Sequence, residues 1–108
     1  MNLPTETFGR VVVAHAPDEL SGENSEALSD ALTRLDHGSV VFDIDGAESF
    51  DSVALTALLE IQERLRDLGG DLKISAANHV NRKILEITRL DRQLEVFDSV
   101  IDAVKSFG

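Results

Sequence analysis

The sequence has no cysteine, only two prolines and no long hydrophobic run among its 108 residues. Without cysteine, the chain can form no disulfide framework, no thiolate metal site and no cysteine nucleophile. No stretch approaches the roughly 18 apolar residues of a membrane-spanning helix, and the first residues lack the apolar core of a secretory signal. We therefore expect a cytoplasmic protein, and the length predicts a single domain over residues 1–108.

Basic residues are also scarce. Ten Lys and Arg stand against 20 Asp and Glu, which gives a net charge of −10 at pH 7. A chain of this charge repels nucleic-acid backbones and anionic membrane surfaces, so neither is an expected partner. Residues 18–63 hold twelve of the acidic residues and only Arg34 of the basic ones, a local charge of −11. This acidic half indicates either a face for a basic protein partner or a surface kept soluble by its charge.

Hydrophobic periodicity predicts strands that alternate with helices. The β-branched run Val11–Val13 is typical of a strand, and the apolar residues of 27–35 recur on one helical face. Asn24 or Ser25 is expected to cap that helix, and Gly69-Gly70 to end the next one. The predicted strands are 8–16, 39–44, 72–76 and 94–97, and the predicted helices are about 24–37, 52–68, 80–88 and 100–107.

This order of elements predicts an α/β layered fold, in which a mixed, mostly parallel sheet is flanked by about four helices. Functional loops of such folds follow the carboxyl ends of the strands. Here those loops are residues 18–24 and 46–53, which carry most of the acidic character. We therefore expect both loops at one edge of the molecule.

The segment Val40–Gly46, VVFDIDG, is similar to the start of the haloacid dehalogenase phosphatases. On that reading Asp43 attacks phosphorus and Asp45 transfers the proton, with Mg²⁺ neutralising the phosphate. Ala47 stands where the family has a hydroxyl residue, and only 62 residues follow Gly46. The phosphatase is therefore a disfavoured alternative, and a receiver-like role for Asp43 lacks its second acidic pair and its lysine.

Histidine and serine offer little support for catalysis or metal binding. His15, His37 and His79 have no ligand spacing, so we predict no metal site and no cofactor. Ser52 beside Asp51 could join a Ser-His-Asp site, but no spacing supports one. Ser52 at a turn before a helix is more typical of an N-cap residue.

Residues 50–59, FDSVALTALL, resemble the central signature of STAS domains, the anti-sigma factor antagonist family. The family's usual form is Asp-Ser-Ser-Gly-Leu, followed by an apolar helix and a Gly-Gly stop. Residues 18–21, 77–90 and 96–100 resemble further family motifs in the same order, so the resemblance covers about residues 8–107. It implies a small STAS-like layered α/β fold and a non-catalytic, protein-binding function.

The resemblance also implies a phosphorylation switch, which this sequence alters. Well-known members bind a kinase-type anti-sigma factor and are switched off when the kinase phosphorylates the second hydroxyl residue of the signature. Here Val53 stands at that position, so the usual switch is lost or altered. Ser52 becomes the candidate phosphorylation site, and Thr56, one turn into the helix, is expected to be less accessible. The same residues also resemble STAS subunits of ABC-type lipid-transport complexes, which is the alternative function.

Together, the edge loops and the resemblance predict a docking surface with apolar Val53 at its centre and acids around it. The expected partner is an anti-sigma factor of the serine-kinase type or, in the alternative, a transporter ATPase. The predicted contact residues are Glu19, Leu20, Ser21, Glu48, Asp51, Ser52, Val53 and Thr56.

Overall fold

A computed structural model of the chain describes residues 1–35 and 38–108. His37, expected at the end of the first helix, lies outside these ranges. The strands are β1 (Thr5–Phe8), β2 (Val11–His15), β3 (Glu19–Leu20), β4 (Ser39–Asp43), β5 (Ser49–Phe50), β6 (Asp71–Ser75) and β7 (Glu95–Phe97). The helices are α1 (Ser25–Thr33), α2 (Ser52–Asp67), α3 (His79–Ile87) and α4 (Val100–Lys105), with a 3₁₀ turn at Leu90–Arg92.

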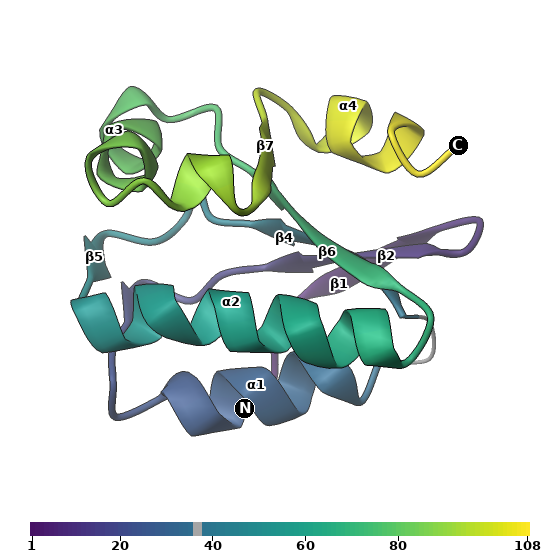
Figure 1. Cartoon of the computed structure of the whole chain (residues 1–108), viewed down its shortest axis with the longest axis horizontal. Helices are drawn as coiled ribbons and strands as arrows, with labels where there is room; N and C mark the ends of the chain where they lie inside the picture. The colour runs from purple at the N-terminus through teal and green to yellow at the C-terminus, as the bar shows by residue number, and fades with distance from the viewer. Residues whose placement is uncertain (36–37) are drawn as a thin grey trace.

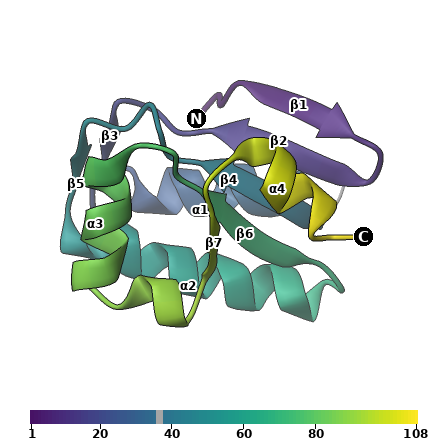
Figure 2. The ribbon, with the colours of Figure 1, turned by 90° about the horizontal axis from the view of Figure 1, so that it is seen from above.

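The main sheet has the order β1-β2-β4-β6-β7, and only β1 runs antiparallel to its neighbour. Helices α1 and α2 lie side by side on one face of this sheet, as Figure 1 shows. The short helix α4 packs on the other face, which is clearest from above (Figure 2). The predicted mixed, mostly parallel sheet flanked by four helices is confirmed. No helix of the described ranges is long and apolar enough to cross a bilayer.

The core explains why the central strands are almost continuously apolar. Parallel strands covered on both faces must bury successive side chains in opposite directions. In β4, Val40 and Phe42 pack with the helices α1 and α2, while Val41 joins a smaller cluster beneath α4. The larger cluster contains Leu28 and Leu58, so it joins both helices to the sheet.

The N-terminal strand was predicted as one element over 8–16, and this prediction is wrong. The structure has a hairpin in which Thr5–Phe8 pairs with Val11–Ala14. Gly9 makes the turn with a φ of 61°, a left-handed conformation that glycine adopts without steric cost. The prediction missed the turn because it took the strand straight through Gly9-Arg10, the two residues between the paired Phe8 and Val11.

Helix ends and very short strands also differ from prediction. Helix α1 ends at Thr33 rather than near 37, and α4 ends at Lys105 rather than at 107. The two-residue strands β3 and β5 were not predicted, because two residues carry no periodicity. The glycine stop after α2 is confirmed: Gly69 has a φ of 89°, and Gly70 N donates to Leu65 O at 2.8 Å.

Candidate functional site

The two acidic loops meet at the carboxyl edge of the sheet, as predicted. Strand β3 pairs in parallel with β5, with Glu19 opposite Ser49. Glu48 N donates to Asp18 O at 2.7 Å, and Asp51 N donates to Leu20 O at 3.0 Å. Loops that are distant in the sequence are therefore held to each other by backbone hydrogen bonds, which fixes the start of α2.

Asp51 joins the two loops and caps α2. One carboxylate oxygen accepts from Ala54 N at 2.9 Å, and the other accepts from Gly22 N at 2.7 Å. These hydrogen bonds, with a further one from Val53 N, hold the pKa of Asp51 below its ordinary value because they stabilise the carboxylate. The N-cap is thus Asp51, and the prediction of Ser52 as cap is wrong. Ser52 is the exposed first residue of α2.

Val53 presents an apolar side chain to solvent in the first turn of α2. Its exposed fraction is 57%, although neighbouring Ala54 and Leu55 are buried. The loop before α1 closes tightly against its base, since a Cβ on Gly22 would lie 3.2 Å from Val53 Cβ. The side chain is therefore held in place on one side and open on the other.

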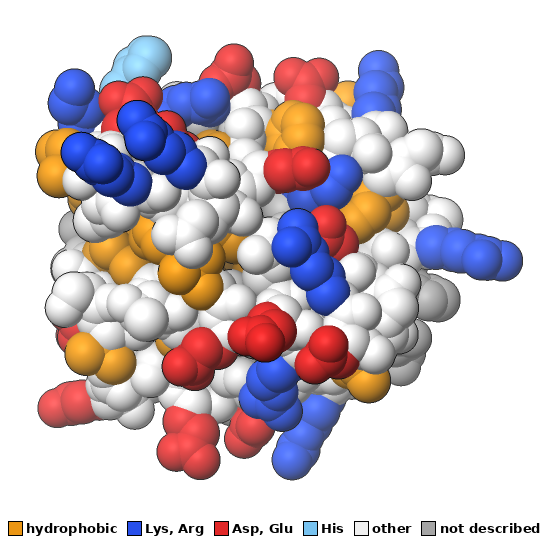
Figure 3. Space-filling view, viewed as in Figure 1, with side chains coloured by type: hydrophobic (Ala, Val, Ile, Leu, Met, Phe, Trp, Pro, Cys, Tyr) orange, Lys and Arg blue, Asp and Glu red, His pale blue; other side chains and the backbone are white. Residues whose placement is uncertain are grey.

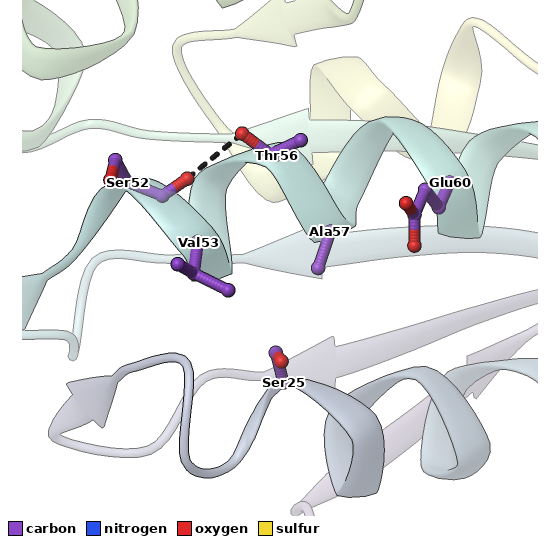
Figure 4. Close-up of a pocket in the computed structure, with 6 residues that line it drawn as sticks. All are labelled: Ser25, Ser52, Val53, Thr56, Ala57 and Glu60. Atoms are coloured by element: carbon purple, nitrogen blue, oxygen red, sulfur yellow. Dashed lines mark hydrogen bonds between the residues drawn. The ribbon is translucent and has the colours of Figure 1, made fainter.

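A groove of about 270 Å³ runs between α1 and α2 beside Val53. Val53 and Ala57 project from α2 toward α1, and Ser25 of α1 faces them (Figure 4). Thr56 also lines the groove, and its hydroxyl donates to Ser52 O at 2.9 Å. Thr56 is exposed, as Ser52 is.

The remaining predicted contact residues differ in how exposed they are. Glu19 and Glu48 are exposed at the edge, and Ser21 is half-buried. Leu20 is only 1% exposed and packs in the core, so its predicted role as a contact residue is wrong. In the two-residue strand β3, one side chain points outward and its neighbour points inward.

Asp43 and Asp45, the residues of the phosphatase alternative, are engaged in structural hydrogen bonds. Asp43 contacts His15 Nδ1 at 2.8 Å and accepts from Asp45 N at 3.0 Å. Asp45 accepts from Asn78 N at 2.8 Å, which ties the loop after β4 to the start of α3. Among the described residues, no three acidic or histidine side chains are arranged to hold a metal ion.

Sequence reasoning missed the groove residues Ala57, Glu60 and Ser25. Ala57 and Glu60 lie four and seven residues after Val53, so helical periodicity could have placed them on the same face. Ser25 belongs to another helix, and no sequence signal places it opposite Val53.

Charge is unevenly distributed over this side of the molecule. Lys and Arg gather over α3, whereas acidic side chains spread along α1 and α2, with Lys or Arg among them toward the end of α2 (Figure 3). The exposed apolar Val53 follows the exposed acidic residues Glu48 and Asp51 in the chain. Such an arrangement fits a docking surface with an apolar centre and a charged rim.

The STAS domain family matches residues 2–103, nearly the whole chain. The chain belongs to the STAS domain family. A Thermotoga neapolitana protein, provisionally named an anti-sigma factor antagonist homologue, is 24% identical to this STAS domain over 106 residues, which is 94% of each chain.

Solved structures share the fold. The crystal structure of an anti-sigma factor antagonist from Mycobacterium paratuberculosis gives a TM-score of 0.82 at 22% identity, covering 97% of this STAS domain and 92% of that chain. The phosphorylated form of the Bacillus cell fate determinant SpoIIAA gives a TM-score of 0.69 at 14% identity, covering 99% and 100%. The protein therefore has the STAS fold of anti-sigma factor antagonists.

Proposed function

We propose that this STAS domain is a cytoplasmic, non-catalytic regulator that docks a kinase-type anti-sigma factor through the edge at the start of α2. We call this edge the docking surface and define it by its exposed residues Glu19, Glu48, Asp51, Ser52, Val53 and Thr56. The exposed Val53, held against Gly22 in an acidic surrounding, is the observation that carries the proposal. The name of the Thermotoga relative supports the choice of partner.

Physical chemistry assigns different roles to the apolar centre and the acidic rim. Burial of Val53 against a partner removes apolar surface from water and favours the complex. The acids contribute less to affinity but steer a basic partner and reject acidic ones. Because hydrogen bonds to Asp51 already fix the first turn of α2, little conformational freedom is lost on docking.

Docking is tested by placing a charge at the apolar centre. Val53→Asp should weaken binding to a purified kinase-type anti-sigma factor from the same genome at least tenfold, about 1.4 kcal/mol. The reason is that the complex would then bury an unpaired carboxylate. Isothermal titration calorimetry measures the affinity.

A matched control exists on α3. Val80 is 68% exposed and follows the capping residue Asn78, as Val53 follows Asp51. Val80→Asp therefore makes the same change at an equivalent helix position outside the docking surface, and its affinity should be unchanged. Equal affinity for Val53→Asp and the unmodified protein would refute the surface. Binding to a transporter ATPase alone would support the alternative function.

The proposal includes loss of the usual phosphorylation switch. Valine has no hydroxyl, so the position that the family resemblance assigns to the phosphoryl group cannot accept one. The exposed hydroxyl of Ser52 lies next to it. A phosphate there would add nearly two negative charges at the docking surface.

Incubation with the kinase and ATP tests this loss. Intact-mass spectrometry should show no phosphorylated form, or a form that disappears in Ser52→Ala. Val53→Ser should gain one phosphoryl group at residue 53, because the hydroxyl then stands in the first turn of a helix whose dipole tolerates the charge. Phosphorylation of the unmodified protein at any other residue would contradict the site assignment.

A further inference from the structure

One helical turn beyond the groove residue Glu60, an arginine of the protein itself joins α2 to α1. Arg64 of α2 reaches across to α1, where its Nη1 donates to Ser29 Oγ at 2.7 Å. A guanidinium group thus joins the two helices through a serine hydroxyl.

One helical turn nearer the start of α2, the same positions carry a different pair. Ser25 lies four residues before Ser29, and Glu60 lies four residues before Arg64. Both line the groove beside Val53 (Figure 4). An acid therefore takes the place of the arginine, and the serine is kept.

Neither Ser25 nor Glu60 is bound to a cation. Within residues 1–35 and 38–108, no ion pair involves Glu60. The Ser25 hydroxyl donates to Gly22 O at 3.0 Å, so its lone pairs are free to accept a hydrogen bond. The groove thus offers a carboxylate and a hydroxyl acceptor on facing helices.

Apolar surface borders these acceptors. Val53 and Ala57 project into the groove on the side toward the start of α2. An arginine side chain has an apolar stem and a charged head, and it can cover apolar surface with the first while the second meets polar groups. Its five donors can reach acceptors on two helices at once, as Arg64 illustrates in part.

We propose that the groove binds one arginine side chain of the partner protein. The stem lies on Val53 and Ala57, and the guanidinium donates to the Glu60 carboxylate and the Ser25 hydroxyl. This inference rests on the proposed function, because the arginine belongs to the docked partner. It adds a recognition element, and it makes Glu60 a determinant of partner choice.

The test uses the isolated protein and two small probes. N-acetyl-arginine amide carries the charge, and N-acetyl-citrulline amide is its neutral isostere. In NMR titrations, the arginine probe should shift the backbone amides of Val53, Ala57 and Glu60 along a saturable curve. The citrulline probe should bind more weakly by about threefold or more, because it cannot form the partly exposed ion pair with Glu60.

Two α2 variants complete the titration. Glu60→Gln should reduce binding of the arginine probe to the level of the citrulline probe. Glu63→Gln removes the same charge from an exposed position of the same helix outside the groove, and it should leave binding unchanged. Equal binding of both probes would overturn the inference, because the charge of the guanidinium would then contribute nothing. An equal loss in both variants would also overturn it, because general attraction to an acidic surface would explain the binding.

The outcomes separate this inference from the proposed function. If Val53→Asp abolishes partner binding while the arginine probe shows no preference for the groove, the inference fails and the docking surface stands. If the probe binds as expected but no anti-sigma factor binds, the proposed function fails and the arginine preference of the groove stands.

Discussion

His15 connects three strands through carboxylates on both sides of its ring. Its Nδ1 lies 2.8 Å from Asp43 of β4, and its Nε2 lies 2.8 Å from Glu6 of β1. Burial lowers the pKa of His15, but hydrogen bonds and the negative charges of Glu6 and Asp43 together raise it above its ordinary value of 6.5. Only the imidazolium form can donate to both carboxylates at once.

This contact predicts that stability depends on pH. Because the folded pKa is raised, the contribution of charged His15 is fully present below pH 6.5 and is lost as the pH rises through the folded pKa. The difference in unfolding free energy between the unmodified protein and His15→Gln should therefore be larger at acid pH than at alkaline pH. The change should be about 1 kcal/mol or less, because solvent screens the partly exposed pair.

Urea unfolding monitored by circular dichroism at several pH values measures this difference. His79→Gln replaces an exposed histidine outside the contact and serves as the control. A difference that stays constant with pH for His15→Gln would contradict the prediction. An equal change of this difference with pH in the His15→Gln and His79→Gln variants would also contradict the prediction.

Single residues were predictable where chemistry depends on the local sequence. Val53 was expected to be exposed in the first turn of α2, and it is. The cap was assigned to Ser52 instead of Asp51, because the sequence does not show that Gly22 would offer a second donor to a carboxylate. Leu20 was misplaced for a similar reason, since a strand of two residues has no period to show which side chain turns inward.

Between elements, one close approach joins Gly38, which precedes β4, to Gly70, which precedes β6. A Cβ on Gly70 would lie only 2.0 Å from Gly38 O, and that oxygen accepts from Asp71 N at 3.0 Å. Backbone must therefore move to admit any side chain at Gly70. The turn that positions β6 beside β4 depends on this contact.

Gly70→Ala should destabilise the protein by roughly 1–3 kcal/mol, the usual cost of overpacking. Gly46→Ala is the matched control, because a Cβ there meets only Ala16 O at an ordinary 3.5 Å. Urea midpoints of the two variants give the comparison. Equal midpoints would show that the two loops do not approach this closely in solution.

Elements with a clear apolar period were predicted well, and those without one were missed. Helix α2 was placed to within one residue at its end, because its leucines repeat on one face and a glycine pair follows. The β1–β2 hairpin was missed because one glycine makes the turn. Strands β3 and β5 were missed although they assemble the docking surface.

At the scale of the whole molecule, acidic and basic side chains are unevenly distributed over the surface. Acidic side chains are frequent over α1 and α2, and cations gather over α3 (Figure 3). The sequence predicted the acidic half and the edge where its loops meet, because parallel strands bring their carboxyl ends to one side. It could not predict the groove, since the rotation of α1 against α2 depends on how buried residues such as Leu28 and Leu58 pack.

The paired strands β3 and β5 make the docking surface a discontinuous epitope. Hydrogen bonds join residues 18–24 to residues 46–54 across this surface. A synthetic peptide that reproduces only the second segment would lack the Gly22 donor and the loop that presses on Val53. Mimicry of the proposed docking surface therefore requires the folded scaffold, and transplanting residues 46–54 alone would not reproduce it.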